Sequence, residues 1–327
     1  MTSVEAPATT AVAFGSDDSM PWLFRAADAA SLAGQRRFMQ LTAASLAVLL
    51  VAAASGPIVN VLTDSDATQR WSATVAAVAF IAAIIQRSFV LATRPERAWY
   101  DGRALAESAK TLAWRYAVGA SPFEAGSDGA DERFTLRLRA ILKSFPDLVL
   151  EPGLLDGEQI TPHMRGLRSA ALTDRVAVYR QHRIEQQRLW YTSRALKHGK
   201  RGQMLGILTL LSESLGTVLA ISFAASLIHT DLLSICAAAA SGLIAWERAH
   251  QDTTLAKAYS VAAQELAAIR DLVGSQRDEE AWSQFVIEAE TAISREHTLW
   301  RASRGGEAAT FSDGHYEATP ESPGKSP

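Results

Sequence analysis

The sequence predicts an all-α membrane protein with two transmembrane helical hairpins and cytoplasmic helical bundle or coiled-coil extensions. Two long apolar stretches, Phe38–Ala92 and Met204–Trp246, each contain two helix-length segments separated by a short polar turn. A bilayer core of about 30 Å needs about 20 helical residues at 1.5 Å of rise each. No credible strand pattern is found along the 327 residues. The pattern therefore indicates four spans and no sheet.

The first predicted hairpin consists of the spans Leu41–Val61 and Trp71–Ala92. Gly56 and Pro57 are expected to bend or end the first span, because proline lacks an amide donor and clashes with the preceding turn. Trp71 opens the second span, and tryptophan is typical of the membrane–water boundary.

The second predicted hairpin consists of Met204–Ile228 and Leu232–Trp246. The first of these spans carries one charge, Glu213. The second is rich in alanine and of marginal length, so it needs its hairpin partner. Cys236 is the chain's only cysteine, which excludes an intrachain disulfide, and we expect it to face the membrane.

Five sections follow from this pattern. They are a disordered N-terminus (1–20), the first hairpin with a cytoplasmic helix (21–124), a cytoplasmic helical linker (125–172), the second hairpin with a C-terminal helical pair (173–304) and a disordered tail (305–327). In the linker, Thr161 is expected to cap the N-terminus of a helix whose first residue is Pro162. After the fourth span a heptad seam predicts pairing with the last helix or with another subunit: Leu255, Tyr259, Ala262, Leu266, Ile269 and Val273.

Basic residues predict the orientation of the spans in the cell inner membrane. One side of the four predicted spans is flanked by Arg36, Arg37, Arg94, Arg97, Arg103, Arg194, Lys197, Lys200, Arg201 and Arg248. The two connecting turns on the other side hold only Arg70. Because positive charge is enriched in cytoplasmic loops, both termini and the segment Thr93–Gln203 are expected in the cytoplasm.

Composition and motifs argue against an enzyme and against a nucleic-acid-binding protein. The net charge of −3 provides no basic surface for nucleic acid. The sequence holds no HExxH, no Walker A loop, no G-x-G-x-x-G and no G-x-S-x-G motif. The seven histidines are scattered singly. We therefore predict no catalytic residue, no cofactor and no metal site.

Glu213 is the leading candidate functional residue, because a charge inside a span is costly and usually faces a partner or water. Counted from the outer helix ends, Glu213 and Arg87 lie at nearly the same depth. Three interpretations remain open. Glu213 and Arg87 form a buried pair between the hairpins, or Arg87 snorkels to the headgroups while Glu213 bonds to a hydroxyl, or Glu213 lines a pore in an oligomer.

The fourth span also carries candidate helix-packing residues. Ala237 with Ser241, and Ala238 with Gly242, have the small-xxx-small spacing that lets membrane helices approach closely. Chance occurrence in an alanine-rich helix is the alternative.

Two stretches resemble a known family. Trp99–Tyr116, which reads WYDGRALAESAKTLAWRY directly after the first hairpin, is similar to the SLATT group. The stretch Phe285–Trp300, ending ISREHTLW, is similar to it as well. SLATT proteins are bacterial two-transmembrane domains associated with SMODS nucleotidyltransferases and SLOG nucleotide sensors. The chain resembles a tandem version over roughly residues 21–304.

The resemblance implies an oligomeric, pore-forming or membrane-permeabilising effector of an anti-phage conflict system. It implies the lipid bilayer, further copies of the chain and a nucleotide-sensing or nucleotidyltransferase protein encoded nearby as partners, and it carries over no catalytic residue. The alternative is a membrane-anchored helical scaffold that binds a cytoplasmic partner without forming a pore.

Overall fold

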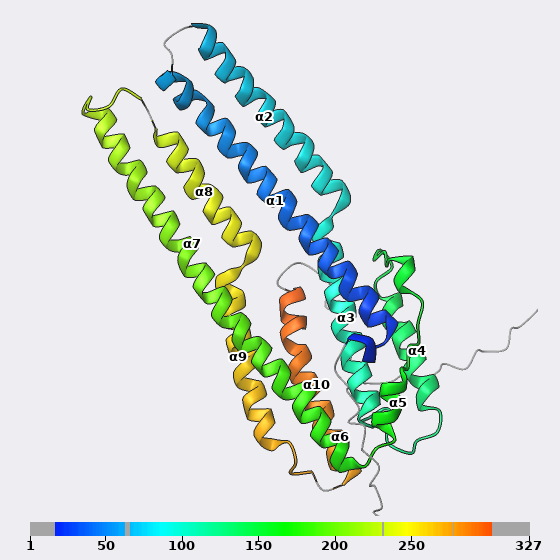
Figure 1. The fold of residues 1–327 in the computed structure, drawn as a ribbon. Helices are drawn as coiled ribbons and strands as arrows, with labels where there is room; N and C mark the ends of the chain where they lie inside the picture. The colour runs from blue at the N-terminus through cyan, green and yellow to red at the C-terminus, as the bar shows by residue number, and fades with distance from the viewer. Residues whose placement is uncertain (1–16, 63–65, 231, 277, 303–327) are drawn as a thin grey trace, which may run out of the picture.

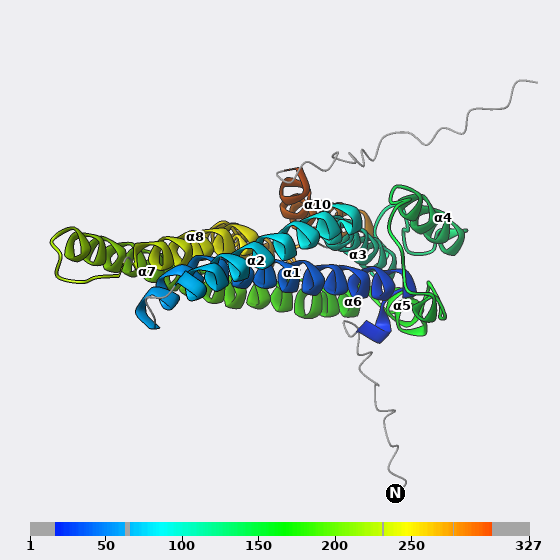
Figure 2. The same cartoon turned by 90° about the horizontal axis from the view of Figure 1, so that it is seen from above.

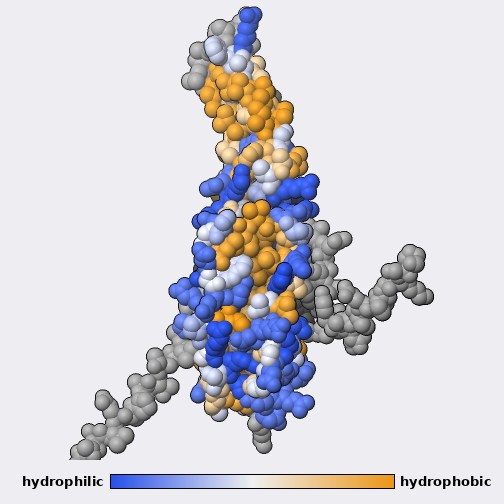
Figure 3. All heavy atoms as spheres, turned by 90° about the vertical axis from the view of Figure 1, so that its right-hand side faces the viewer, coloured by the Kyte–Doolittle hydropathy of each residue, from blue (hydrophilic) through white to orange (hydrophobic). Residues whose placement is uncertain are grey.

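A computed structural model describes residues 17–62, 66–230, 232–276 and 278–302. These residues form helices joined by turns and contain no strand, which confirms the all-α prediction. Three helical segments are long and apolar enough to cross a membrane: Trp22–Val59, Arg70–Ala117 and Leu172–Ala224. Figure 3 shows an apolar band towards the hairpin end of the molecule and a mostly hydrophilic opposite end. The chain is therefore an all-α membrane protein.

The membrane helices belong to two repeats of the same plan. The first repeat consists of α1 (Trp22–Leu62), α2 (Asp66–Thr93) and α3 (Pro95–Ala117). The second consists of α7 (Gln186–Ala224), α8 (Leu233–His250) and α9 (Asp252–Leu272). In each repeat a long helix pairs with the hairpin helix at one end and with the third helix at the other. The long helices thus connect the apolar and polar parts of the fold (Figure 1).

A single residue with left-handed backbone ends the hairpin in each repeat. Arg94, with φ 41°, separates α2 from α3, and Gln251, with φ 53°, separates α8 from α9. Pro95 begins α3. Proline is tolerated at this position because the first amides of a helix have no partner within the helix. These matched breaks provide a common reference for depth in the two repeats.

Two glycines let α1 and α3 approach closely. A Cβ atom on Gly34 would lie 2.6 Å from the Trp99 backbone nitrogen, and one on Gly102 would lie 2.8 Å from the Ser31 nitrogen. Ser31 Oγ donates a hydrogen bond of 3.0 Å to the Trp99 carbonyl at this crossing. The first repeat therefore depends on backbone contact that any side chain would block.

The two hairpins contact one another through α1 and α8, while α2 and α7 lie at opposite edges (Figures 1 and 2). Within the second hairpin, α7 meets α8 at Gly216, where a Cβ would lie 3.0 Å from Cys236 Cβ. Ser212 Oγ donates to the Cys236 carbonyl at 3.0 Å. Cys236 is buried, so the expectation that it faces the membrane is wrong.

The remaining helices build the end of the molecule opposite the hairpin turns (Figure 1). They are η1 (Asp17–Ser19), α4 (Ala130–Lys143), η2 (Pro152–Leu154), α5 (Pro162–Arg168), α6 (Leu172–Val178), the π-helix η3 (Tyr179–Glu185) and α10 (Glu279–Ala302). The predicted cap of α5 is confirmed, because Thr161 Oγ1 accepts a hydrogen bond from the Met164 amide at 3.2 Å. The main core lies here, with α3 in contact with α4, α5 and α10.

The structure differs from two expectations and adds to a third. Helix α1 continues through Pro57 to Leu62, so the proline does not end it. The segment 17–20 is ordered, and Ser19 and Met20 are buried because the N-terminus packs on the linker, where Thr161 Oγ1 donates to the Ser19 carbonyl. Helix α9, which carries the heptad seam, contacts α10 as predicted, but its more extensive contact is with α7. Residues 1–16 and the tail from 303 onward lie outside the described residues.

Candidate functional site

Glu213 lies exposed on a face of α7 that none of the described residues covers. The α8-facing side of α7 carries Ser212 and Gly216, and Glu213 is rotated about 100° from Ser212. Gly206, Leu210 and Thr217, which share its side at helical spacing, are also exposed. One membrane helix therefore presents a stripe of small and polar residues with a carboxylate at its centre.

The structure does not bring Glu213 and Arg87 together. Both side chains are exposed, they lie on α7 and α2 at opposite edges of the hairpin pair, and no described ion pair joins them (Figure 1). Glu213 lies beside Cys236, about 22 Å of helix before the Gln251 break. Arg87 lies only about 10 Å of helix before the Arg94 break. The two residues are therefore not at equal depth when both are counted from these breaks.

The predicted small-residue pairs do not form the α7–α8 contact. Ala237 and Ser241 are exposed, and Ala238 and Gly242 are half-buried. A Cβ on Gly242 would meet nothing within 4 Å. The contact instead uses Cys236 against Gly216, so Ala237 and Ser241 remain available to a neighbouring molecule.

A polar cluster lies where α7, α8 and α9 meet, at the junction between the second hairpin and α9. Asp252, the first residue of α9, is fully buried. Its Oδ1 lies 2.6 Å from His198 Nδ1 and its Oδ2 lies 3.3 Å from Arg201 Nε. The Arg201 guanidinium also lies over the Trp246 ring, 5.8 Å from its centre. These contacts fasten α7, α8 and α9 to one another just below the apolar segment.

The most buried ion pair lies between η3 and α10, and a hydrogen bond from α3 connects it to the first repeat. Arg183 in η3 donates to both carboxylate oxygens of Glu290 in α10, at 2.8 and 2.6 Å. Tyr179 and Thr111 donate to the same carboxylate at 3.0 and 2.9 Å. Burial alone would lower the pKa of the Arg183 guanidinium. The negative charge of Glu290 and the hydrogen bonds to it, together with the neighbouring groups, have the larger combined effect, so the pKa of Arg183 lies above its ordinary value. Burial, reinforced by Glu290, also raises the pKa of the Tyr179 hydroxyl.

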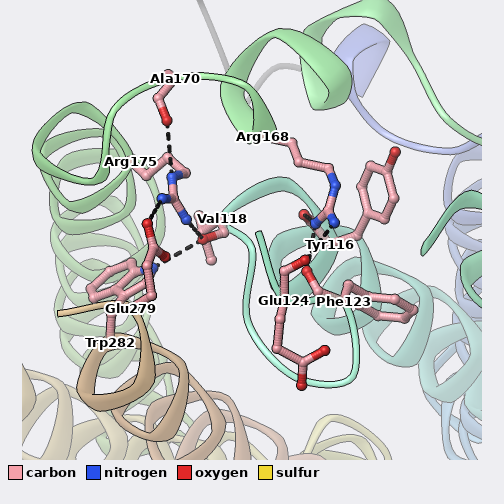
Figure 4. A network of polar contacts seen from close by, with 9 residues as sticks. All are labelled: Tyr116, Val118, Phe123, Glu124, Arg168, Ala170, Arg175, Glu279 and Trp282. Atoms are coloured by element: carbon pink, nitrogen blue, oxygen red, sulfur yellow. Dashed lines mark hydrogen bonds and ion pairs between the residues drawn. The ribbon is translucent and has the colours of Figure 1, made fainter. Parts of the chain in front are cut away.

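A second buried arginine fixes the loop after α3 (Figure 4). Arg175, 2% exposed, donates to the Val118 carbonyl at 2.8 Å and to the Ala170 carbonyl at 3.2 Å, and it pairs with Glu279 of α10. The Val118 carbonyl also accepts from Trp282 Nε1 at 3.0 Å. The first and second repeats therefore share polar contacts at this point.

Arg168 holds the other side of the same loop (Figure 4). It donates to the carbonyls of Tyr116, Phe123 and Glu124 and stacks over the Tyr116 ring at 4.9 Å. The Tyr116 and Glu124 carbonyls also accept the backbone amides of Gly119 and Ser127, so the guanidinium adds a further donor to this loop. Such contacts suit a rigid link rather than a catalytic centre.

Sequence reasoning missed these buried arginine contacts. Arg183 and Glu290 are 107 positions apart, and helical spacing alone carries no information on such a contact. The described residues hold no group of three or more histidine, cysteine or carboxylate side chains placed to bind a metal ion.

Comparison with known families gives two matches. Residues 21–176 match the model described as SMODS and SLOG-associating 2TM effector domain 3, and residues 179–300 match effector domain 1 of the same series. No curated protein and no solved structure matches the chain. The two matches meet near α6 and η3, where the second long helix begins. The chain therefore belongs to the SLATT family of two-transmembrane effector domains and carries two such domains in tandem.

Proposed function

We propose that this protein is an oligomeric effector of a bacterial conflict system that permeabilises the inner membrane. In this proposal α1, α2, α7 and α8 span the bilayer, both termini are cytoplasmic, and α3, α9 and α10 belong to a cytoplasmic bundle. The effector acts on the bilayer and not by catalysis. Family membership supports the effector role and the membrane location.

One observation carries the oligomer and the pore: Glu213 is exposed on an apolar helix. A carboxylate facing hydrocarbon is strongly unfavourable, so such residues face a bundle interior or water. A single chain offers Glu213 neither, because α8 covers the other side of α7. Further copies placed against this face of α7 would give Glu213 a polar lumen shared by several subunits.

The fourth span is shorter than the other three, and its neighbours support its placement in the membrane. Helix α8 has 18 residues, which correspond to about 27 Å. It lies against α7 on one side and α1 on the other, so it is flanked by two longer apolar helices. The basic residues near the Arg94 and Gln251 breaks favour a cytoplasmic location for that end.

Leakage from dye-loaded liposomes that contain the purified full-length protein tests this proposal. We expect dye release, and particles larger than one chain by light scattering. A monomeric protein that releases no dye would contradict it.

A chimaera separates the effector from a membrane-anchored scaffold. Replacing both hairpins by unrelated hydrophobic hairpins should abolish leakage and growth arrest, whereas a scaffold would keep its cellular activity. A nucleotidyltransferase or nucleotide-sensor gene next to this one would support the predicted partner.

A further inference from the structure

The cytoplasmic end contains a cavity of about 260 Å³ between the two SLATT domains. Its walls come from the start of α1, from α3, and from the segment where η3 continues into α7. The lining includes aromatic rings and polar groups together: Phe24, Arg103, Lys110, His182, Gln187 and Trp190. A cavity whose wall combines aromatic rings with convergent polar groups can hold a small molecule.

Lys110 is the basic residue of this lining for which the described part of the chain provides no hydrogen bond and no ion pair. No described residue forms a hydrogen bond or an ion pair with its ammonium, which instead lies over the Phe24 ring, 5.9 Å from the ring centre. Burial lowers the pKa of Lys110. A partly desolvated ammonium with free donors favours a bound acceptor of negative charge.

The other charged side chains around the cavity limit where the charged group of a ligand can bind. Arg103 is already paired with Glu107 at 3.2 Å and stacks over Trp190 at 5.9 Å. Asp28 and Glu107 also line the wall. These two carboxylates disfavour an anion along the rest of the wall, so the anionic group of a ligand is directed to Lys110.

We propose that this cavity binds a small metabolite with one anionic group, a carboxylate or a phosphate ester, at Lys110 and an apolar or aromatic body against Phe24 and Trp190. Gln186 and Gln187 supply amide donors and acceptors for the ligand's remaining polar atoms. Binding at this site is independent of whether the membrane helices form a pore.

The position of the cavity also couples it to the membrane. Thr111, next to Lys110, donates to Glu290, which binds Arg183 of η3. Helix η3 continues without a break into α7, which carries Glu213. A ligand that contacts α1, α3 and α7 together therefore restrains the first repeat against the second.

Calorimetric titration of the full-length protein in lipid nanodiscs with benzoate and with phenyl phosphate tests the proposal. We expect at least one of these probes to bind and the neutral analogue benzamide to bind far more weakly. Lys110→Met should weaken the binding at least about tenfold, as expected for a lost charged hydrogen bond. The matched control is Lys143→Met on the exposed end of α4, which should leave affinity unchanged.

Two further readouts keep the test decisive. Lys110→Arg keeps the positive charge and should retain most of the affinity, which separates loss of charge from misfolding. A preference for phenyl phosphate identifies a phosphate ester, and a preference for benzoate identifies a carboxylate. Failure of both probes to bind at millimolar concentration, or equal affinity in the folded Lys110→Met protein, would overturn the proposal.

Discussion

The Arg183–Glu290 pair predicts a large loss of stability from a change of one carboxylate to an amide. Both side chains are 1% exposed, and Glu290 accepts four hydrogen bonds between 2.6 and 3.0 Å from Arg183, Tyr179 and Thr111. Glu290→Gln leaves the guanidinium buried without a counter-charge and turns an amide donor towards other donors. Breaking one partner of a buried pair costs about 3–5 kcal/mol.

Thermal unfolding of the purified protein, followed by tryptophan fluorescence, measures this loss. For a domain of 150–250 residues each kcal/mol shifts the melting temperature by about 2–4 °C, so we expect a decrease of at least about 6 °C. Glu288→Gln is the matched control, because Glu288 is exposed on the same helix and bonds only to Gln284. That control should change stability by less than about 0.5 kcal/mol.

A double variant checks the physical reason. Arg183→Met combined with Glu290→Leu removes both charges, and apolar replacements of a buried pair are often neutral. We expect it to be more stable than Glu290→Gln alone. A Glu290→Gln protein with the melting temperature of the wild type would refute the reasoning. So would a double variant whose loss of stability equals the sum of the losses of the two single variants.

Three other changes follow from close contacts and burial. Gly34→Ala should destabilise the first repeat by about 1–3 kcal/mol in thermal unfolding, because the new Cβ would lie 2.6 Å from a backbone atom of α3. Gly56→Ala is the control and should be neutral or stabilising, because a Cβ at Gly56 would meet nothing within 4 Å. Gly216→Leu should separate α7 from α8 and lower the melting temperature in detergent, and an unchanged value or an equal loss in Gly206→Leu would contradict this. Asp252→Asn should lower stability by about 1–3 kcal/mol in the same assay, because His198 and Arg201 would lose the carboxylate that they contact. Unchanged stability would count against a structural role for Asp252.

The membrane helices were predictable from sequence because a run of apolar residues at 1.5 Å per residue specifies length without reference to tertiary contacts. Helix α5 and its Thr161 cap were predictable for the same local reason. The left-handed breaks at Arg94 and Gln251 were not, since neither is glycine or asparagine and the conformation is imposed by packing.

The candidate site was predictable only in part. Glu213 was found because a charged residue within an apolar run stands out in the sequence. The side of α7 on which it lies was not predictable, because the contact of Gly216 with Cys236 of α8 determines which side of α7 faces α8. The depth of Arg87 was misjudged because α2 begins at Asp66 rather than at Trp71 and α7 ends at Ala224 rather than at Ile228, so the two residues are not equally far from the hairpin turns. The Lys110 cavity unites three segments far apart in sequence, which no periodicity reveals.

Cysteine accessibility tests the central proposal, a water-filled lumen lined by Glu213, most directly. Cys236 is the only cysteine, so Cys236→Ala gives a cysteine-free background in which Glu213→Cys and Leu211→Cys can be compared. Both positions are exposed on α7, but Leu211 lies about 160° around the helix from Glu213. We predict that a membrane-impermeant thiol reagent modifies Glu213→Cys and blocks dye leakage, while Leu211→Cys stays unmodified in lipid. Modification of Leu211→Cys alone, or of neither, would contradict the account.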